Sequence, residues 1–123
     1  MPSIHSACLI PILTLAVCAA CSNDPIVCTA QFVPAVVVEV RDSMTEGPLA
    51  AGARGSVRDG TFLDSLRPFT SVSLQGAGER PGTYTVTIVH PGYADWLLAD
   101  VRVHRDVCHV VTVNLQARLQ PAP

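Results

Sequence analysis

The stretch "ERPGTYTVTIVHPGYADW", Glu79 to Trp96, decides the fold of this chain. Inside it the large apolar residues Tyr84, Val86 and Ile88 alternate with threonines. Alternation with a period of two puts the apolar set on one face of a β-strand and the β-branched polar set on the other. A Pro-Gly pair stands on each side, and such pairs mark turns because Pro cannot donate to a ladder and Gly allows positive φ. We therefore predict turn, strand and turn here, with one buried face.

The same period appears elsewhere in the chain. In residues 36–40 the valines at even positions are apolar while Glu39 points the other way, and residues 111–119 have apolar residues at odd positions. The pair Asp59-Gly60 is a favoured two-residue hairpin turn. Residues 71–76 are a further short strand candidate, and no helix of normal length is predicted after the leader. About seven short strands with turn signals between them predict an all-β fold, a seven-stranded antiparallel β-sandwich.

The first twenty residues differ from the rest. "MPSIHSACLIPILTLAVCAA" contains no Asp, Glu, Lys or Arg, and its apolar run ends in small residues beside a cysteine. This pattern indicates a secretory signal, and the run is too short, and too interrupted by Pro11, for a membrane span of about 20 apolar residues. The sequence thus predicts an exported protein.

The ending "VCAAC" resembles the lipobox of bacterial lipoproteins. That resemblance implies cleavage after Ala20 and lipidation of Cys21, which becomes the first mature residue. Ser22, in place of an Asp, resembles the lipoproteins that go to the outer membrane. The sequence departs from the pattern in having Cys18 where Leu is usual, and only His5 as a basic residue near the start. A plain cleaved signal peptide, which would give a secreted protein, and an uncleaved anchor stay open as alternatives.

Two cysteines of the mature chain, Cys28 and Cys108, are expected to form a disulfide because an exported chain meets an oxidising compartment. The bond would tie the start of the domain to its last strand. A loop of that length contributes ~4 kcal/mol in the chain-entropy model, as an upper value. A metal site is the weaker interpretation, because no closely spaced Cys or His partners accompany them.

The charge pattern restricts the class of partner. All eight basic residues are Arg, and the formal net charge is −2 with both signs interspersed along the chain. This balance argues against nucleic acid and against a strongly anionic partner.

Four segments together resemble a known family: "VEVRDSMTEGPLAAGA" (38–53), "VRDGTF" (57–62), "GTYTVTIVHPGY" (82–93) and "VRVHRDVCHVVTVNL" (101–115). In this order they are similar to the carboxypeptidase-regulatory-like domains, within the transthyretin-like (prealbumin-like) group of Ig-like sandwiches, over about residues 33–119. The resemblance implies an accessory, adhesive or binding module without catalysis. Transthyretin-like hydrolases of purine breakdown end in Tyr-Arg-Gly-Ser, whereas this chain ends "RLQPAP". Related surface domains with a Lys–Asn crosslink need a Lys, which this chain lacks.

Candidate catalytic and metal-binding residues do not form a recognisable pattern. The alternation predicts His104 and His109 on opposite faces, which argues against shared ligation, and His90 is expected at a strand end. No nucleophile elbow or phosphate loop occurs. Four acids lack the spacing of a calcium loop; they are Asp42, Glu46, Asp59 and Asp64. We predict no cofactor and no metal.

Three aromatic residues have competing interpretations. Tyr93 and Trp96 would stack on a sugar or anchor a partner if they lay side by side in solvent. The sequence favours instead that they close one end of the core. Tyr84 is expected in the core, with its hydroxyl bonded to the backbone of the preceding corner.

The sequence therefore divides into a lipoprotein-type signal peptide (1–20), a tether (21–32), the sandwich (33–119) and a frayed C-terminal tail (120–123). We expect a non-enzymatic binding or structural module of the cell envelope, held to the membrane by lipid on Cys21, with an unknown protein or carbohydrate partner. A small transthyretin-like hydrolase and a carbohydrate-binding module are the alternatives. A His90 or His109 sharing a concave pocket with an Arg would favour the hydrolase.

Overall fold

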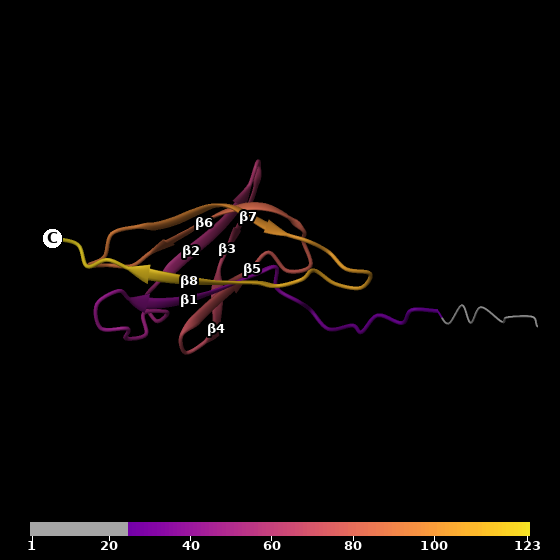
Figure 1. Ribbon diagram of the computed structural model, residues 1–123, viewed down its shortest axis with the longest axis horizontal. Helices are drawn as coiled ribbons and strands as arrows, with labels where there is room; N and C mark the ends of the chain where they lie inside the picture. The colour runs from indigo at the N-terminus through magenta and orange to yellow at the C-terminus, as the bar shows by residue number, and fades with distance from the viewer. Residues whose placement is uncertain (1–24) are drawn as a thin grey trace, which may run out of the picture.

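The protein is an all-β sandwich of two four-stranded sheets, as the computed structural model shows for residues 25–123, the part of the chain it describes (Figure 1). No helix occurs within these residues. In chain order the strands are β1 (Val36–Asp42), β2 (Arg54–Asp59), β3 (Phe62–Ser65), β4 (Arg67–Thr70), β5 (Ser73–Gly76), β6 (Gly82–Val89), β7 (Trp96–Val103) and β8 (Val113–Leu119).

The two sheets differ in their pairing. One has the order β3-β2-β6-β7 and is antiparallel throughout. The other has the order β4-β5-β1-β8, and in it β1 pairs antiparallel with β5 but parallel with β8. The predicted sandwich is thus confirmed, with one parallel pair that the alternation could not reveal.

The strand count is eight in the described residues rather than about seven. The strand that sequence reasoning missed is β4, in which all four residues are exposed. It has no apolar face to produce an alternating pattern, and it contains Pro68, which favours edge strands. It forms the edge of its sheet beside β5, so only its partner strand defines it.

The core lies between the sheets and is built from the alternation seen in the sequence. Tyr84, Val86 and Ile88 of β6 are fully buried, as are Val36, Val38 and Val40 of β1. These central strands of opposite sheets supply most of the large, fully buried side chains. The one buried face that was predicted for each of these two strands is confirmed.

Close packing at the crossing between the sheets requires a glycine. Leu66 links β3 of one sheet to β4 of the other, and its side chain is buried. A Cβ added to Gly55 would lie 2.6 Å from Leu66 Cδ1 and 2.7 Å from Ile88 Cδ1. Gly55 therefore leaves the space that these two side chains fill. At the predicted β2–β3 hairpin, Gly60 has φ of +58°, which glycine adopts without steric cost.

The C-terminal residues do not fray, contrary to the sequence-based expectation. Pro121 and Tyr93 form an isolated antiparallel β-bridge. On either side of it, the N–H of Ala94 donates to Gln120 O and the N–H of Ala122 donates to Gly92 O, each at 2.9 Å. The tail is thus an extension of β8 that pairs with the turn before β7. A tail rich in proline gives no sign of this, because its partner is distant in sequence.

Candidate functional site

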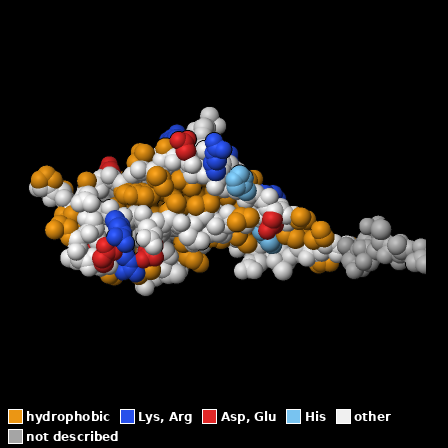
Figure 2. Space-filling view, viewed as in Figure 1, with side chains coloured by type: hydrophobic (Ala, Val, Ile, Leu, Met, Phe, Trp, Pro, Cys, Tyr) orange, Lys and Arg blue, Asp and Glu red, His pale blue; other side chains and the backbone are white. Residues whose placement is uncertain are grey.

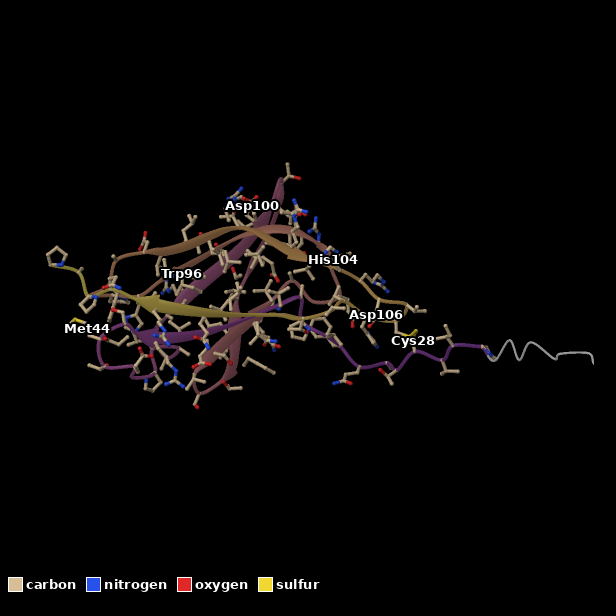
Figure 3. The ribbon with its side chains drawn as sticks, viewed as in Figure 1. Cys28, Met44, Trp96, Asp100, His104 and Asp106 are labelled. Carbon is tan, nitrogen blue, oxygen red and sulfur yellow. A yellow bond between two sulfur atoms is a disulfide. The ribbon has the colours of Figure 1, made fainter. Side chains whose placement is uncertain are left out.

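The predicted disulfide is present and fixes the N-terminal segment to the sandwich. Cys28 and Cys108 are bonded with an S–S distance of 2.06 Å across 80 residues of chain. Cys108 lies in the loop between β7 and β8, not in the last strand as predicted, since β8 begins only at Val113. Figure 3 shows Cys28 and Asp106 near each other, at the end of the molecule where the N-terminal chain leaves.

The loop that contains Cys108 is a hairpin with its own backbone hydrogen bonds. Arg105 and Val110 form an isolated antiparallel β-bridge. Within the loop, Asp106 Oδ1 accepts hydrogen bonds from the N–H groups of Cys108 and His109, each at 2.8 Å. These two backbone donors favour the charged carboxylate and lower the pKa of Asp106 from its ordinary value. The hairpin from Arg105 to Val110 therefore presents the cysteine in a fixed position.

His109 is the centre of a second attachment. Its Nδ1 lies 2.7 Å from Glu79 Oε1 and its Nε2 lies 3.1 Å from Thr29 Oγ1. The same Glu79 oxygen accepts the N–H of Val33 at 2.9 Å, and the N–H of Glu79 donates to Val33 O at 2.9 Å. Burial alone would raise the pKa of Glu79, but the bonds from His109 and Val33 outweigh it and lower that pKa.

We call this set the tether junction; it comprises Cys28, Thr29, Val33, Glu79, Cys108 and His109. Three segments that are far apart in sequence meet in it: the residues before β1, the β5–β6 loop and the β7–β8 hairpin. Sequence reasoning found the cysteines but missed Glu79 and His109 as a pair. No local signal marks them, because their contact depends on how the two loops pack.

The opposite end of the sandwich is closed by Tyr93. Its hydroxyl donates to Asp42 Oδ2 at 2.6 Å, while Asp42 Oδ1 accepts the N–H groups of Met44 and Thr45 at 2.7 and 3.0 Å. The Tyr93 bond, followed by the two backbone bonds, lowers the pKa of the nearly buried Asp42 carboxyl, and the same bond raises the pKa of Tyr93. The group fastens the β1–β2 loop to the start of β7.

Tyr93 and Trp96 do not form an exposed aromatic pair. Both are partly buried and pack against the core. The ring of Tyr93 instead meets His90 edge to face, with 5.2 Å between centroids. The core interpretation favoured by the sequence describes their packing, and a sugar-binding role for the two rings stays a prediction.

His90 and Arg54 share a shallow depression, the feature that was expected to favour a hydrolase. The depression is open to solvent, measures about 340 Å³, and is lined by Gly52, Arg54, Val89, His90 and Pro91. Both ring nitrogens of His90 face backbone carbonyls, Nδ1 at 2.8 Å from Pro91 O and Nε2 at 3.2 Å from Ala51 O. A general base needs a nitrogen directed at the substrate, and neither is so directed here.

Two of the acids considered for calcium, Asp59 and Asp64, make hydrogen bonds within the fold. Asp59 accepts a hydrogen bond from the Arg80 guanidinium at 3.1 Å, and Asp64 accepts one from the N–H of Ala77 at 2.9 Å.

The Tyr84 hydroxyl donates to Arg80 O at 2.6 Å, which confirms the predicted hydrogen bond to the backbone of the preceding corner. The Arg80 guanidinium lies 3.9 Å above the Phe62 ring. Across residues 25–123, no three His, Cys, Asp or Glu side chains are grouped closely enough to hold a metal ion.

The candidate lipidation residue, Cys21, lies outside the described residues. From residue 25 onward, no helix has the length and apolar character needed to cross a membrane.

Comparison with known proteins adds no assignment: no family model and no curated protein matches the chain.

Proposed function

We propose that this protein is a non-enzymatic lipoprotein of the bacterial cell envelope, anchored by lipid on Cys21. Its sandwich would serve as a binding or structural module of the carboxypeptidase-regulatory-like type, with a protein or carbohydrate partner. The outer membrane or its periplasmic face is the proposed location.

The observation that carries this proposal is the tether junction. Cys28 follows Cys21 by seven residues and is bonded to Cys108, while Val33 and Thr29 are held by Glu79 and His109. In a chain that carries an anchor, such a junction would transmit the position of the anchor to the sandwich. Lipoproteins of the family carry several acyl chains, and each buried CH₂ contributes about 0.8 kcal/mol to membrane binding.

The contacts of the carboxylate side chains support the proposal that the protein is not an enzyme. Asp42, Asp59, Asp64, Glu79 and Asp106 all accept hydrogen bonds that fasten loops. Catalytic sites place such groups where they reach a substrate.

Mass spectrometry of the mature protein from its native host tests the proposal. We expect an N-terminal Cys21 that carries diacylglycerol, and recovery of the protein in the membrane fraction. The Cys21→Ser variant should lose the lipid mass and leave that fraction, while the matched Cys18→Ser variant should keep both. An unmodified mature N-terminus elsewhere in the chain would refute the lipoprotein proposal.

A small hydrolase is the second candidate, and the depression shared by His90 and Arg54 favours it. If it is correct, His90→Ala and Arg54→Ala should each abolish hydrolysis of a cyclic amide of the purine-breakdown type, while His104→Ala should not. Absence of any turnover by the parent protein would remove this candidate.

A further inference from the structure

The end of the sandwich that carries the tether junction has an unusual concentration of exposed apolar side chains. Five of the ten large hydrophobic residues that are exposed in residues 25–123 lie here. Figure 2 shows orange surface at this end of the molecule, on the right. We call these five residues the apolar tip: Ile26, Val27, Phe32, Val107 and Val111. Exposed apolar side chains that gather at one end of a molecule favour a contact with another molecule or with a membrane.

Two segments build the apolar tip, and the disulfide joins them. Ile26 and Val27 precede Cys28 directly, and Val107 precedes Cys108 directly. Val107 is 71% exposed, although the hairpin that carries it is well ordered by Asp106. The covalent bond therefore keeps apolar side chains from two distant parts of the chain together in solvent.

The length of chain beyond the junction limits how far this end can be from an anchor. Seven residues separate Cys21 from Cys28. An extended chain spans at most about 3.6 Å per residue, so the disulfide lies within roughly 25 Å of a lipidated Cys21. The N-terminal chain leaves this end along the long axis of the molecule, whereas the C-terminus lies at the other end (Figure 1). With Cys21 lipidated as proposed above, the membrane surface therefore lies within reach of the apolar tip.

The charges of the hairpin nearly cancel. Arg105 and Asp106 are both exposed, and the two backbone N–H groups that bond Asp106 favour its charged carboxylate. Glu79 is held by His109 and Val33. The contact with lipid therefore depends on the apolar side chains, because binding to the interface of a bilayer strengthens with the apolar area that is buried in it.

We propose that the apolar tip is a membrane-docking surface, which inserts Val107 and its neighbours at the level of the lipid headgroups and sets the orientation of the sandwich. The proposal deepens the lipoprotein function and rests on it for the position of the anchor. It assigns a role to the disulfide beyond stability, because the bond joins the docking hairpin to the anchored segment.

A tryptophan probe at the tip tests this orientation in the chain that begins at Cys21. In the oxidised protein Cys21 is the only free thiol after the leader, so it can be coupled to a maleimide lipid in vesicles of phosphatidylcholine and phosphatidylglycerol. Val107→Trp places the probe in the tip. Met44→Trp is the matched control, because Met44 is 78% exposed and lies at the opposite end of the molecule (Figure 3). The native Trp96 is a constant background.

With phospholipids brominated near the headgroup, we expect loss of the Val107→Trp emission and a blue shift, while Met44→Trp changes no more than the parent protein. Reduction of the disulfide should lower the quenching at position 107. Equal quenching at positions 107 and 44, or none at either, would overturn the proposal, and quenching unaffected by reduction would overturn the role of the disulfide. Because the anchor is attached chemically, these results do not depend on whether cells lipidate Cys21.

Discussion

Removal of the disulfide gives a prediction whose size can be worked out from the structure. The Cys28→Ser/Cys108→Ser variant opens a loop of 80 residues in the unfolded chain. In the chain-entropy model, closing that loop disfavours the unfolded state by about 4.5 kcal/mol at 25 °C. This value is an upper bound, because the folded protein also loses freedom when the bond forms.

In the folded protein, forming the disulfide costs conformational entropy. This entropy is lost by the short segment between Cys28 and the next residue that is bonded to the sandwich. Cys28 is exposed, and Val33 is the first residue of the segment whose backbone is bonded to the sandwich, through Glu79. Without the disulfide, the residues between Cys28 and Val33 keep only the Thr29–His109 contact and the packing of Phe32 against Gly78. The bond closes a loop of about six residues there, so the net stabilisation is about 1.5RT ln(80/6), or ~2.3 kcal/mol.

Urea unfolding of the parent and the double variant, followed by circular dichroism, measures this difference. We expect a lower midpoint and a larger m-value in the variant, since its unfolded state exposes more surface. Reduction of the parent protein should reproduce the shift. A loss near 4.5 kcal/mol would show that residues 28–33 are ordered without the bond, and a loss below about 1 kcal/mol would contradict the loop argument altogether.

Three further changes test the core and the two corners. Tyr84→Phe should cost about 1–3 kcal/mol, measured by thermal unfolding, because the partly buried Arg80 carbonyl loses its 2.6 Å donor; an unchanged midpoint would contradict this. Gly55→Ala should cost about 1–3 kcal/mol by overpacking, since its Cβ would lie 2.6 Å from a buried leucine methyl; a stabilised variant would show that the core has spare room. The pKa of Asp42 is lower in the folded than in the unfolded protein, so its stabilisation is complete above its ordinary pKa and is lost as pH falls through the folded-state pKa. Tyr93→Phe should therefore flatten the fall in urea midpoint between neutral and acidic pH, and an equally steep fall would rule out this role for the hydrogen bond.

The local sequence pattern was sufficient to predict those strands and turns whose own residues specify them. The alternation in β1 and β6 predicted which side chains are buried, because a strand has only two faces and one of them meets the core. Asp59-Gly60 predicted the hairpin, because a two-residue turn is determined by the φ values that its own residues allow. Cys28 and Cys108 are the two cysteines in residues 25–123, and their predicted pairing is confirmed.

The sequence by itself thus determined a sandwich, its buried faces and the disulfide between Cys28 and Cys108. Only the tertiary structure decided that β1 lies parallel to β8, that exposed β4 is a strand, that the tail pairs with Gly92 and Ala94, and that Glu79 meets His109. The physical reason is that a period of two specifies which way a side chain points but not which strand or loop lies beside it. That choice depends on packing between segments that are distant along the chain, and the tether junction and the apolar tip both arise from it.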